Sequence, residues 1–318
     1  MKVVFFGTPD FAVPTLNKLI ENNFEVLAVV TQPDKPKGRS GKLAFSPVKE
    51  VAISNNIPVL QYEKINKEGI LELQNLNADV FVTAAYGQIL SKAVLTASKY
   101  GVFNVHGSLL PKYRGAAPIQ WAVINGETET GITILRSDVG MDDGDIILKT
   151  PVKILEGETA GELFDRLKDV GANSLIEALN QLKNGTITYT PQNHAEATIC
   201  KMLNKELSKI DFSKPAKSVV NLILGLNPWP VAEINLIEGR FKVFKAIELS
   251  SNQVQNLNLT DTFKNGEIVC ANSKNGLIIK CSTGFIEITD IQAENSKRMD
   301  TKSMLNGKKI KVGQIANE

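Results

Sequence analysis

The chain has 318 residues, which suggests two domains at ~150 residues each. Hydrophobic residues make up 43% of it and charged residues 22%, so the composition excludes a disordered, collagen-like or coiled-coil protein. The formal net charge of +2 excludes a protein coated uniformly in positive charge, while it leaves room for local basic surfaces.

The first half of the chain alternates short apolar runs with segments of helical periodicity. The runs that predict strands are residues 3–6, 25–31, 78–85, 101–106, 131–135 and 146–152. Thr159 and Glu162 form a capping-box pattern, which predicts the start of a long helix. The alternation predicts an α/β fold with a doubly wound, mostly parallel sheet that has helices on both faces.

The second half of the chain changes character. Residues 191–206 are polar and weakly patterned, which is typical of a linker. After a predicted helix at 213–224, short alternating runs predict a small antiparallel β-barrel, similar to an OB fold, over residues 207–318. The expected organisation is therefore a first domain at residues 1–190, a linker at 191–206 and a second domain at 207–318.

Cysteine usage and the first residues indicate the compartment. The three cysteines, Cys200, Cys270 and Cys281, contain no C-x-x-C pair, which is typical of a reducing environment. The opening stretch has too few apolar residues for a signal peptide, and no run reaches the ~18 apolar residues of a membrane span. We therefore expect a soluble, cytoplasmic protein with no membrane partner.

Two common kinds of ligand site are disfavoured. The first strand ends at Gly7 without the G-x-G-x-x-G pattern, which makes a nicotinamide-dependent oxidoreductase the weakest interpretation. The only two histidines, His106 and His194, are far apart and have no partner at ligand spacing. The aspartates of residues 138–145 lack the glycine spacing of a calcium loop. We therefore expect no metal.

The most informative segment begins at Asn104. Asn104 and His106 stand two residues apart at the end of a predicted strand, so their side chains share one face near the sheet edge where α/β folds bind ligands. This pair alone favours a structural histidine. The irregular loop of residues 107–111 and the later aspartate-rich turn around Asp142 favour a functional site instead.

An amide, an imidazole and a carboxylate in one pocket can transfer an acyl group without a covalent intermediate. The amide of Asn104 can donate to a developing oxyanion, the imidazole of His106 can move a proton, and the carboxylate of Asp142 can orient the imidazole. No Ser or Cys stands where a nucleophile elbow needs it, so the incoming substrate is expected to supply the nucleophile.

Several motifs resemble those of the folate-dependent formyltransferase family. They are N-x-H-x-S-L-L-P-x-Y-R-G-A-A-P-I from Asn104, G-x-D-x-G-D from Gly140, and F-x-G-T-P-D-F from Phe5. Shorter motifs at residues 31–34, 46–49, 130–133, 225–230 and 305–307 extend the resemblance nearly end to end. The loop at 31–49 and the second domain single out the methionyl-tRNA formyltransferases within this family.

The resemblance implies a formyltransferase-like Rossmann variant that takes 10-formyltetrahydrofolate as co-substrate. It implies a catalytic trio of Asn104, His106 and Asp142, and leaves open which of His106 and Asp142 is the formal base. The residues implied to bind the folate are Tyr86, Gly87, Gln88, Ile89, Leu90, Ser108, Leu109, Leu110 and Pro111. The resemblance also suggests a monomer.

Two basic segments suit the implied partner, initiator methionyl-tRNA. Residues 31–49 hold five basic residues against one aspartate, and residues 297–311 hold six against one. Either alone would be more typical of a solvated surface. The candidate tRNA-binding residues are Lys35, Lys37, Arg39, Lys42, Lys297, Arg298, Lys302, Lys308 and Lys309. Trp229 and Phe241 are expected in the core and not as stacking platforms for bases.

The expected activity is transfer of a formyl group to the α-amino group of methionine on initiator tRNA, which serves translation initiation. The nearest alternative keeps this chemistry with an amino-sugar nucleotide or glycinamide ribonucleotide as acceptor. The other alternative is a non-catalytic RNA-binding protein that uses only the second domain.

Overall fold

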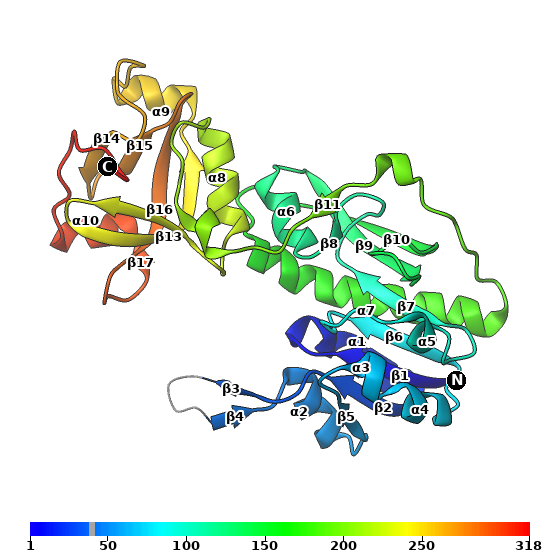
Figure 1. The fold of residues 1–318 in the computed structure, drawn as a ribbon. Coiled ribbons are helices and arrows are strands. Elements are labelled where there is room, and N and C mark those ends of the chain that lie inside the picture. The colour runs from blue at the N-terminus through cyan, green and yellow to red at the C-terminus, as the bar shows by residue number, and fades with distance from the viewer. Residues whose placement is uncertain (38–41) are drawn as a thin grey trace. The chain divides into compact units, whose positions relative to one another are not determined.

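The protein is described here by a computed structural model that covers residues 1–37 and 42–318. These residues form two compact units (Figure 1). The first comprises residues 1–118, 130–153 and 164–200, and the second comprises residues 119–129, 154–163 and 201–318. The second unit therefore includes two short segments that interrupt the first unit in the sequence.

A seven-stranded sheet forms the centre of the first unit. Its order is β10-β9-β7-β6-β1-β2-β5. The strands are β1 (Lys2–Gly7), β2 (Glu25–Thr31), β5 (Val59–Gln61), β6 (Val80–Ala84), β7 (Val102–His106), β9 (Glu129–Arg136) and β10 (Ile146–Lys153). The pairs from β5 to β7 are parallel, and β9 is antiparallel to β7. The predicted mostly parallel sheet is confirmed.

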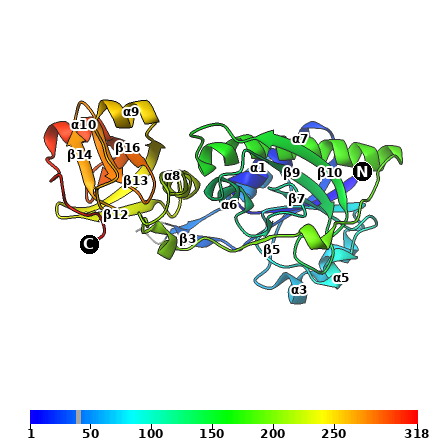
Figure 2. The ribbon, with the colours of Figure 1, turned by 90° about the horizontal axis from the view of Figure 1, so that it is seen from above.

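Helices cover both faces of this sheet, as predicted. They are α1 (Val13–Glu21), α2 (Pro47–Ser54), α3 (Ile65–Glu68), α4 (Ile70–Asn75), α5 (Lys92–Leu95) and α7 (Ala160–Asn184). Figure 2 shows α1 and α7 on one side of the sheet, with α3 and α5 on the other. Side chains alternate along β1, so Val4 and Phe6 pack with Ile65 of α3 and Leu73 of α4, while Val3 and Phe5 face the opposite side.

Short elements complete the first unit. β3 (Lys35–Lys37) pairs antiparallel with β4 (Lys42–Ala44), and β8 (Arg114–Gly115) pairs parallel with β11 (Ile199–Cys200). Two 3₁₀ turns, η1 (Asp10–Ala12) and η2 (His194–Glu196), belong to this unit, and a third, η3 (Lys205–Ser208), belongs to the second unit. The segment expected to be a linker therefore contains a strand and a 3₁₀ turn that pack on the first unit.

The second unit contains a six-stranded sheet of order β12-β13-β16-β15-β14, with β17 paired to β16. Its elements are β12 (Ala232–Leu236), β13 (Gly239–Glu248), β14 (Ile268–Asn272), β15 (Gly276–Lys280), β16 (Phe285–Ala293), β17 (Met299–Asp300), α6 (Pro118–Ile124), α8 (Ala216–Gly225), α9 (Ser251–Asn256) and α10 (Thr301–Gly307). The antiparallel sheet is confirmed. Among the described residues its strand pairs show no closure, so an OB-like barrel stays a prediction.

One core prediction in the second unit is right and one is wrong. Phe241 is fully buried, whereas Trp229 is 52% exposed. Trp229 lies between Pro228 and Pro230 in the turn after α8, where the two prolines keep the chain out of the neighbouring helix and strand. Val231, just beyond, has a φ of +74°, which costs a branched residue about 1–2 kcal/mol and is offset by burial of its side chain.

The capping box predicted before α7 is present. Thr159 Oγ1 accepts a hydrogen bond from Glu162 N at 3.2 Å, and Glu162 Oε2 accepts one from Thr159 N at 2.8 Å. Two N–H groups that would lack partners at the helix start are thereby satisfied. Across the residues that the structure covers, no helix is both long and apolar enough to cross a membrane.

Replacing Thr159 with Ala removes one half of this cap. We expect Thr159→Ala to lower the free energy of unfolding by about 1 kcal/mol, which urea unfolding followed by circular dichroism would measure. Thr188→Ala is the control, because Thr188 is exposed and shows no side-chain hydrogen bond within the described residues. Equal stability of the two variants would contradict the role given to Thr159.

Candidate active site

The candidate site lies where the turn between β9 and β10 meets the end of β7. Asn104 and His106 belong to β7, and Asp142 belongs to the turn of residues 137–145. Asp142 has a left-handed backbone with φ of +47°, which Asp and Asn adopt more readily than most residues. The three residues predicted from the motifs are brought together here.

The carboxylate of Asp142 contacts both other members of the trio. Its Oδ2 accepts a hydrogen bond from the main-chain N–H of Gly115 at 2.8 Å and lies 3.6 Å from Nδ1 of His106. Its Oδ1 accepts a longer bond from Nδ2 of Asn104 at 3.4 Å. The main-chain bond holds the carboxylate in place beside the imidazole and the amide.

His106 is held in one orientation by its second nitrogen. The ring is 6% exposed, and Nε2 lies 2.9 Å from the carbonyl oxygen of Tyr113. Because a carbonyl oxygen can only accept, Nε2 carries a hydrogen and donates it. Nδ1 faces the carboxylate of Asp142, 3.6 Å from its Oδ2.

Thr83 sets the orientation of the Asn104 amide. Thr83 on β6 is the register partner of Asn104 on β7, and its Oγ1 donates to Asn104 Oδ1 at 2.8 Å. The amide oxygen is thus occupied, and the Nδ2 hydrogens face the site. Sequence reasoning missed Thr83, although a hydroxyl within the apolar run of residues 80–84 was an available signal.

The loop after β7 is held by hydrogen bonds of Ser108 within the loop and of Thr133 on β9. Ser108 Oγ donates to the carbonyl of Lys112 at 2.7 Å, and Thr133 Oγ1 donates to the carbonyl of Ser108 at 2.7 Å. Ser108 and Leu110 are fully buried, whereas Leu109 and Pro111 are partly exposed. Within the predicted folate loop, the side chains of Ser108 and Leu110 therefore shape the loop, whereas those of Leu109 and Pro111 can face a ligand.

Sequence comparisons identify relatives over the whole chain. The profile of the formyl transferase family matches residues 1–179, and that of the formyl transferase C-terminal domain matches residues 202–309. The methionyl-tRNA formyltransferase of Lachnospira eligens is 46% identical over 321 residues, covering 100% of each chain. The chain belongs to the methionyl-tRNA formyltransferase family. The enzyme of that name from Clostridioides difficile is also 46% identical, over 99% of each chain.

Solved structures show the same fold at lower identity. A sugar 3N-formyltransferase, crystallised in the presence of dTDP and 5-N-formyl-THF, superposes with a TM-score of 0.68 at 22% identity, covering 93% of this chain and 99% of that one. An N-formyltransferase from Helicobacter canadensis, in complex with folinic acid and dTDP-3-aminofucose, gives 0.68 at 23% identity, covering 92% and 98%. Both likenesses show the fold alone.

In this member of the methionyl-tRNA formyltransferase family, the stretch from Tyr86 to Leu90 follows β6. The ring of Tyr86 is buried against Phe6, and burial raises the pKa of its hydroxyl to about 12. Gly87 has a φ of +93°, which favours glycine, and Gln88 bonds the main chain of Tyr62 and Ile65. The side chains of Tyr86 and Gln88 therefore make contacts within the fold. The side chain of Ile89 is exposed and that of Leu90 is partly buried.

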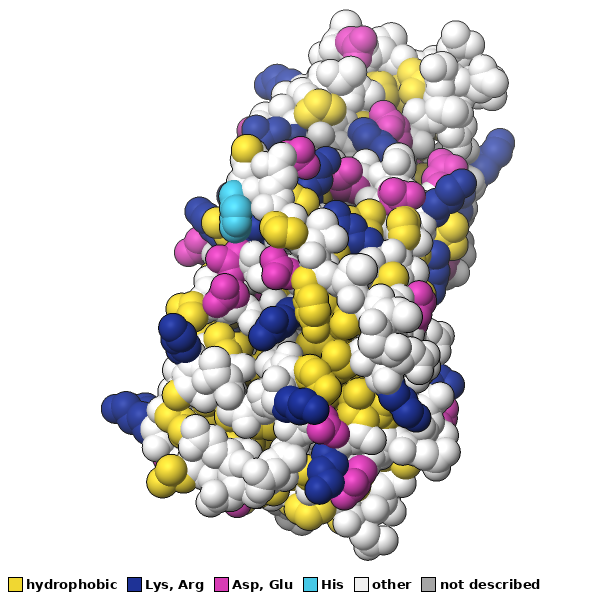
Figure 3. Space-filling model, turned by 90° about the vertical axis from the view of Figure 1, so that its right-hand side faces the viewer, with side chains coloured by type: hydrophobic (Ala, Val, Ile, Leu, Met, Phe, Trp, Pro, Cys, Tyr) yellow, Lys and Arg dark blue, Asp and Glu magenta, His cyan; other side chains and the backbone are white. Residues whose placement is uncertain are grey.

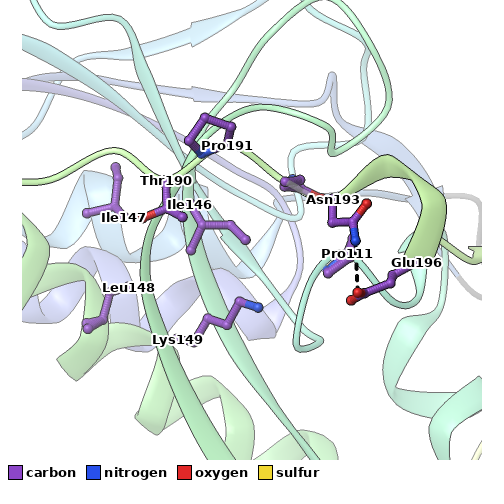
Figure 4. Close-up of a pocket in the computed structure, with 10 residues that line it drawn as sticks. Pro111, Ile146, Ile147, Leu148, Lys149, Thr190, Pro191, Asn193 and Glu196 are labelled. Carbon is purple, nitrogen blue, oxygen red and sulfur yellow. Dashed lines mark hydrogen bonds between the residues drawn. The ribbon is translucent and has the colours of Figure 1, made fainter.

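A cavity of about 380 Å³ opens beside the loop of residues 107–113 (Figure 4). Pro111 forms part of its wall, and β10 and the segment of residues 190–196 form the rest. Asn193 donates to Glu196 at 2.8 Å within it. Gln192, which also lines the cavity, bonds the carbonyl of Asp142. The residues that line the cavity do not include Asn104, His106 or Asp142.

The first basic segment includes the β3–β4 hairpin. Lys35, Lys37 and Lys42 belong to these two strands, whereas Arg39 lies outside the described residues. The predicted tRNA contacts of all four stay predictions. The structure adds how the two ends of the hairpin are held.

A half-buried ion pair joins Asp34, the residue before β3, to Lys49 of α2, the helix that follows β4. Lys49 Nζ contacts Asp34 Oδ2 at 2.5 Å, and Gln61 on β5 bonds both of them at 2.9 and 3.0 Å. Hydrogen bonds from Lys49 and then Gln61 lower the pKa of Asp34. The motifs at residues 31–34 and 46–49 are thus two halves of one clamp. The charge of Lys49 is paired with Asp34 within the chain.

The second basic segment is partly neutralised within its own unit. Arg298 bonds Asp290 through Nε at 2.9 Å, and Lys302 lies 3.0 Å from Glu287. Lys308 Nζ donates to the carbonyl of Glu238 at 3.3 Å. Lys297 and Lys309 are exposed and have no ion-pair partner in the part of the chain that the structure describes.

Charge elsewhere is mixed. On the face seen in Figure 3, Lys and Arg side chains lie among Asp and Glu and not in one patch. Among residues 1–37 and 42–318, no group of three or more His, Cys, Asp or Glu could hold a metal ion.

Replacing Tyr86 with Phe tests whether its side chain serves the core or the ligand. The buried hydroxyl has no hydrogen-bond partner among the described residues, so Tyr86→Phe should raise the free energy of unfolding by about 1 kcal/mol. We expect the KM for 10-formyltetrahydrofolate to stay unchanged. Tyr62→Phe is the matched control, because it removes a hydroxyl that donates to Glu72 at 2.7 Å and should destabilise. A raised folate KM for Tyr86→Phe would show that the hydroxyl contacts the ligand.

Proposed function

We propose that this protein transfers the formyl group of 10-formyltetrahydrofolate to the α-amino group of methionine on initiator tRNA. The mutual contact of Asn104, His106 and Asp142 carries the proposal, because an amide donor, an imidazole and a carboxylate are what formyl transfer to an amine requires. In this proposal residues 1–190 form the catalytic domain, 191–206 a linker and 207–318 an OB-like domain that binds tRNA. A monomeric, cytoplasmic enzyme fits these substrates.

The reaction begins with attack of the free amine on the formyl carbon. A carbon–nitrogen bond forms, the carbonyl electron pair moves onto oxygen, and the resulting oxyanion needs a donor. Asn104 Nδ2 supplies it, since Thr83 already occupies the amide oxygen. Collapse of the tetrahedral species breaks the bond between the formyl carbon and N10 of the folate.

Proton movement accompanies this collapse. The attacking amine must lose a proton, and the departing folate nitrogen must gain one. His106 and Asp142 act as a unit here, because the carboxylate faces Nδ1 while the carbonyl of Tyr113 fixes the ring. The folate is proposed to lie against the main chain of residues 86–90 and the partly exposed Leu109 and Pro111.

The acceptor is assigned from the relatives and from the basic segments. Relatives that share 46% of residues over the whole chain are named methionyl-tRNA formyltransferases, whereas the sugar formyltransferase with the same fold is 22% identical. Proposed phosphate contacts come from Lys35, Lys37, Arg39 and Lys42, and from the exposed Lys297 and Lys309. Arg298, Lys302 and Lys308 would have to exchange partners in the chain for phosphate.

Purified protein incubated with 10-formyltetrahydrofolate and Met-tRNA should produce formyl-methionyl-tRNA, scored after hydrolysis of the ester. Replacing Asn104, His106 or Asp142 with Ala should each lower kcat by ~10²-fold or more while the melting temperature stays near that of the wild type. Asp165→Ala, on the exposed side of α7, is the control. Transfer to an amino-sugar nucleotide or glycinamide ribonucleotide and not to Met-tRNA would change the acceptor, and no transfer at all would leave RNA binding alone.

Loss of the clamp between Asp34 and Lys49 should weaken only the binding of tRNA. Asp34→Asn removes the charge that holds Lys49, so we expect a higher KM for Met-tRNA with unchanged kcat and folate KM. Because the pKa of Asp34 is lowered in the folded protein, the clamp is complete at neutral pH and is lost only as pH falls through that pKa. Asp169→Asn is the control, because Asp169 is exposed on α7 and has no ion pair within the described residues. An unchanged KM for Met-tRNA would show that the hairpin does not depend on the clamp.

A further inference from the structure

Gln192 lies at the start of the segment whose sequence is typical of a linker, yet it is only 6% exposed. Its amide nitrogen donates to the carbonyl of Asp142 at 2.8 Å and to the carbonyl of Gly144 at 2.8 Å. Its amide oxygen accepts from Arg114 Nε at 3.1 Å and from Nη2 at 2.7 Å. One buried side chain therefore joins the turn that carries Asp142 to Arg114 of β8.

Every hydrogen-bonding position of this amide is used. A primary amide has two N–H donors and two acceptor lone pairs, and Gln192 meets two carbonyls with the donors and one guanidinium with the acceptor. Carbonyls cannot donate and a guanidinium cannot accept, so the amide has one possible orientation. Glutamate has the same shape, but it would place an oxygen against two carbonyl oxygens.

Arg114 makes the same connection from the other side. Its guanidinium is buried and bonds Gln192, with Nδ1 of His194 as a further partner at 3.3 Å from Nη2. The next residue, Gly115, donates its main-chain N–H to the Asp142 carboxylate. β8 thus holds Asp142 twice, directly through Gly115 and indirectly through Arg114 and Gln192.

The turn needs such support because its own hydrogen bonds leave its centre free. The main chain of Arg136 bonds the carbonyl of Asp145 at 2.8 Å and closes the two ends of the turn. Asp142, near the centre, has a left-handed backbone that must be held by contacts from outside. Gln192 bonds the carbonyl of that residue itself.

We propose that Gln192 is a positioning residue for Asp142, acting through the main chain of the turn and braced by Arg114. This inference rests on the proposed function, in which Asp142 orients His106. Gln192 touches no reacting atom. Its role is to keep the carboxylate within reach of Nδ1 of His106 and Nδ2 of Asn104.

Gln192→Glu and Gln192→Met should each lower kcat for formyl transfer by ~10²-fold, with the KM for Met-tRNA and for folate little changed. Gln255→Glu makes the same chemical change at an exposed position of α9 and is the matched control. The decisive arm repeats Gln192→Glu in an Asp142→Asn background, where it should cost nothing further, because a residue that acts through Asp142 has no effect once Asp142 is gone.

Amide hydrogen exchange of residues 139–145 reads the same contact without any assay of activity. Exchange should be faster in Gln192→Glu than in the wild type or in Gln255→Glu. An undiminished cost of Gln192→Glu in the Asp142→Asn background, wild-type kcat in Gln192→Glu, or unchanged exchange of the turn would each overturn the proposal. A wild-type protein without formyl transfer would refute the proposed function, while the exchange data would still decide the role of Gln192.

Discussion

The hydrogen bond from the main chain of Gly115 to the carboxylate of Asp142 is the contact on which the candidate site depends. It ties Gly115 of β8 to the turn between β9 and β10, two segments that are not paired in a sheet. With the carboxylate held there, the imidazole of His106 and the amide of Asn104 are in contact with it. The hydroxyl of Thr83 orients the amide of Asn104, and the carbonyl of Tyr113 orients the imidazole of His106.

Sequence predicted the parts of this protein that depend on local pattern. The apolar runs predicted the central strands because a strand that is buried on both faces consists of consecutive apolar residues, as in β1 and β6. The capping box of Thr159 and Glu162 was also predictable, because its two partners lie within four residues of the sequence. The trio of Asn104, His106 and Asp142 was accessible through motifs of fixed spacing.

Contacts between distant residues were not predictable in this way. Gln192 and Arg114 are 78 positions apart, and nothing local to a polar, weakly patterned stretch indicates a buried amide. The pairing of Arg298 with Asp290 turns a candidate phosphate contact into an internal ion pair once β16 and β17 are adjacent. Trp229 was misassigned because its apolar ring favours burial, while the prolines on both sides determine where the chain can go.

The way in which Asp142 is held has a consequence for how this enzyme can change over time. Its turn is fastened through main-chain carbonyls and one main-chain N–H, so the exposed side chains of Val139 and Met141 contribute nothing to that fastening. Mutations at those two positions can remodel the outer surface of the turn while the reacting groups keep their geometry. The outer surface of the turn can therefore vary in sequence while the contacts of its main chain keep the carboxylate of Asp142 in place.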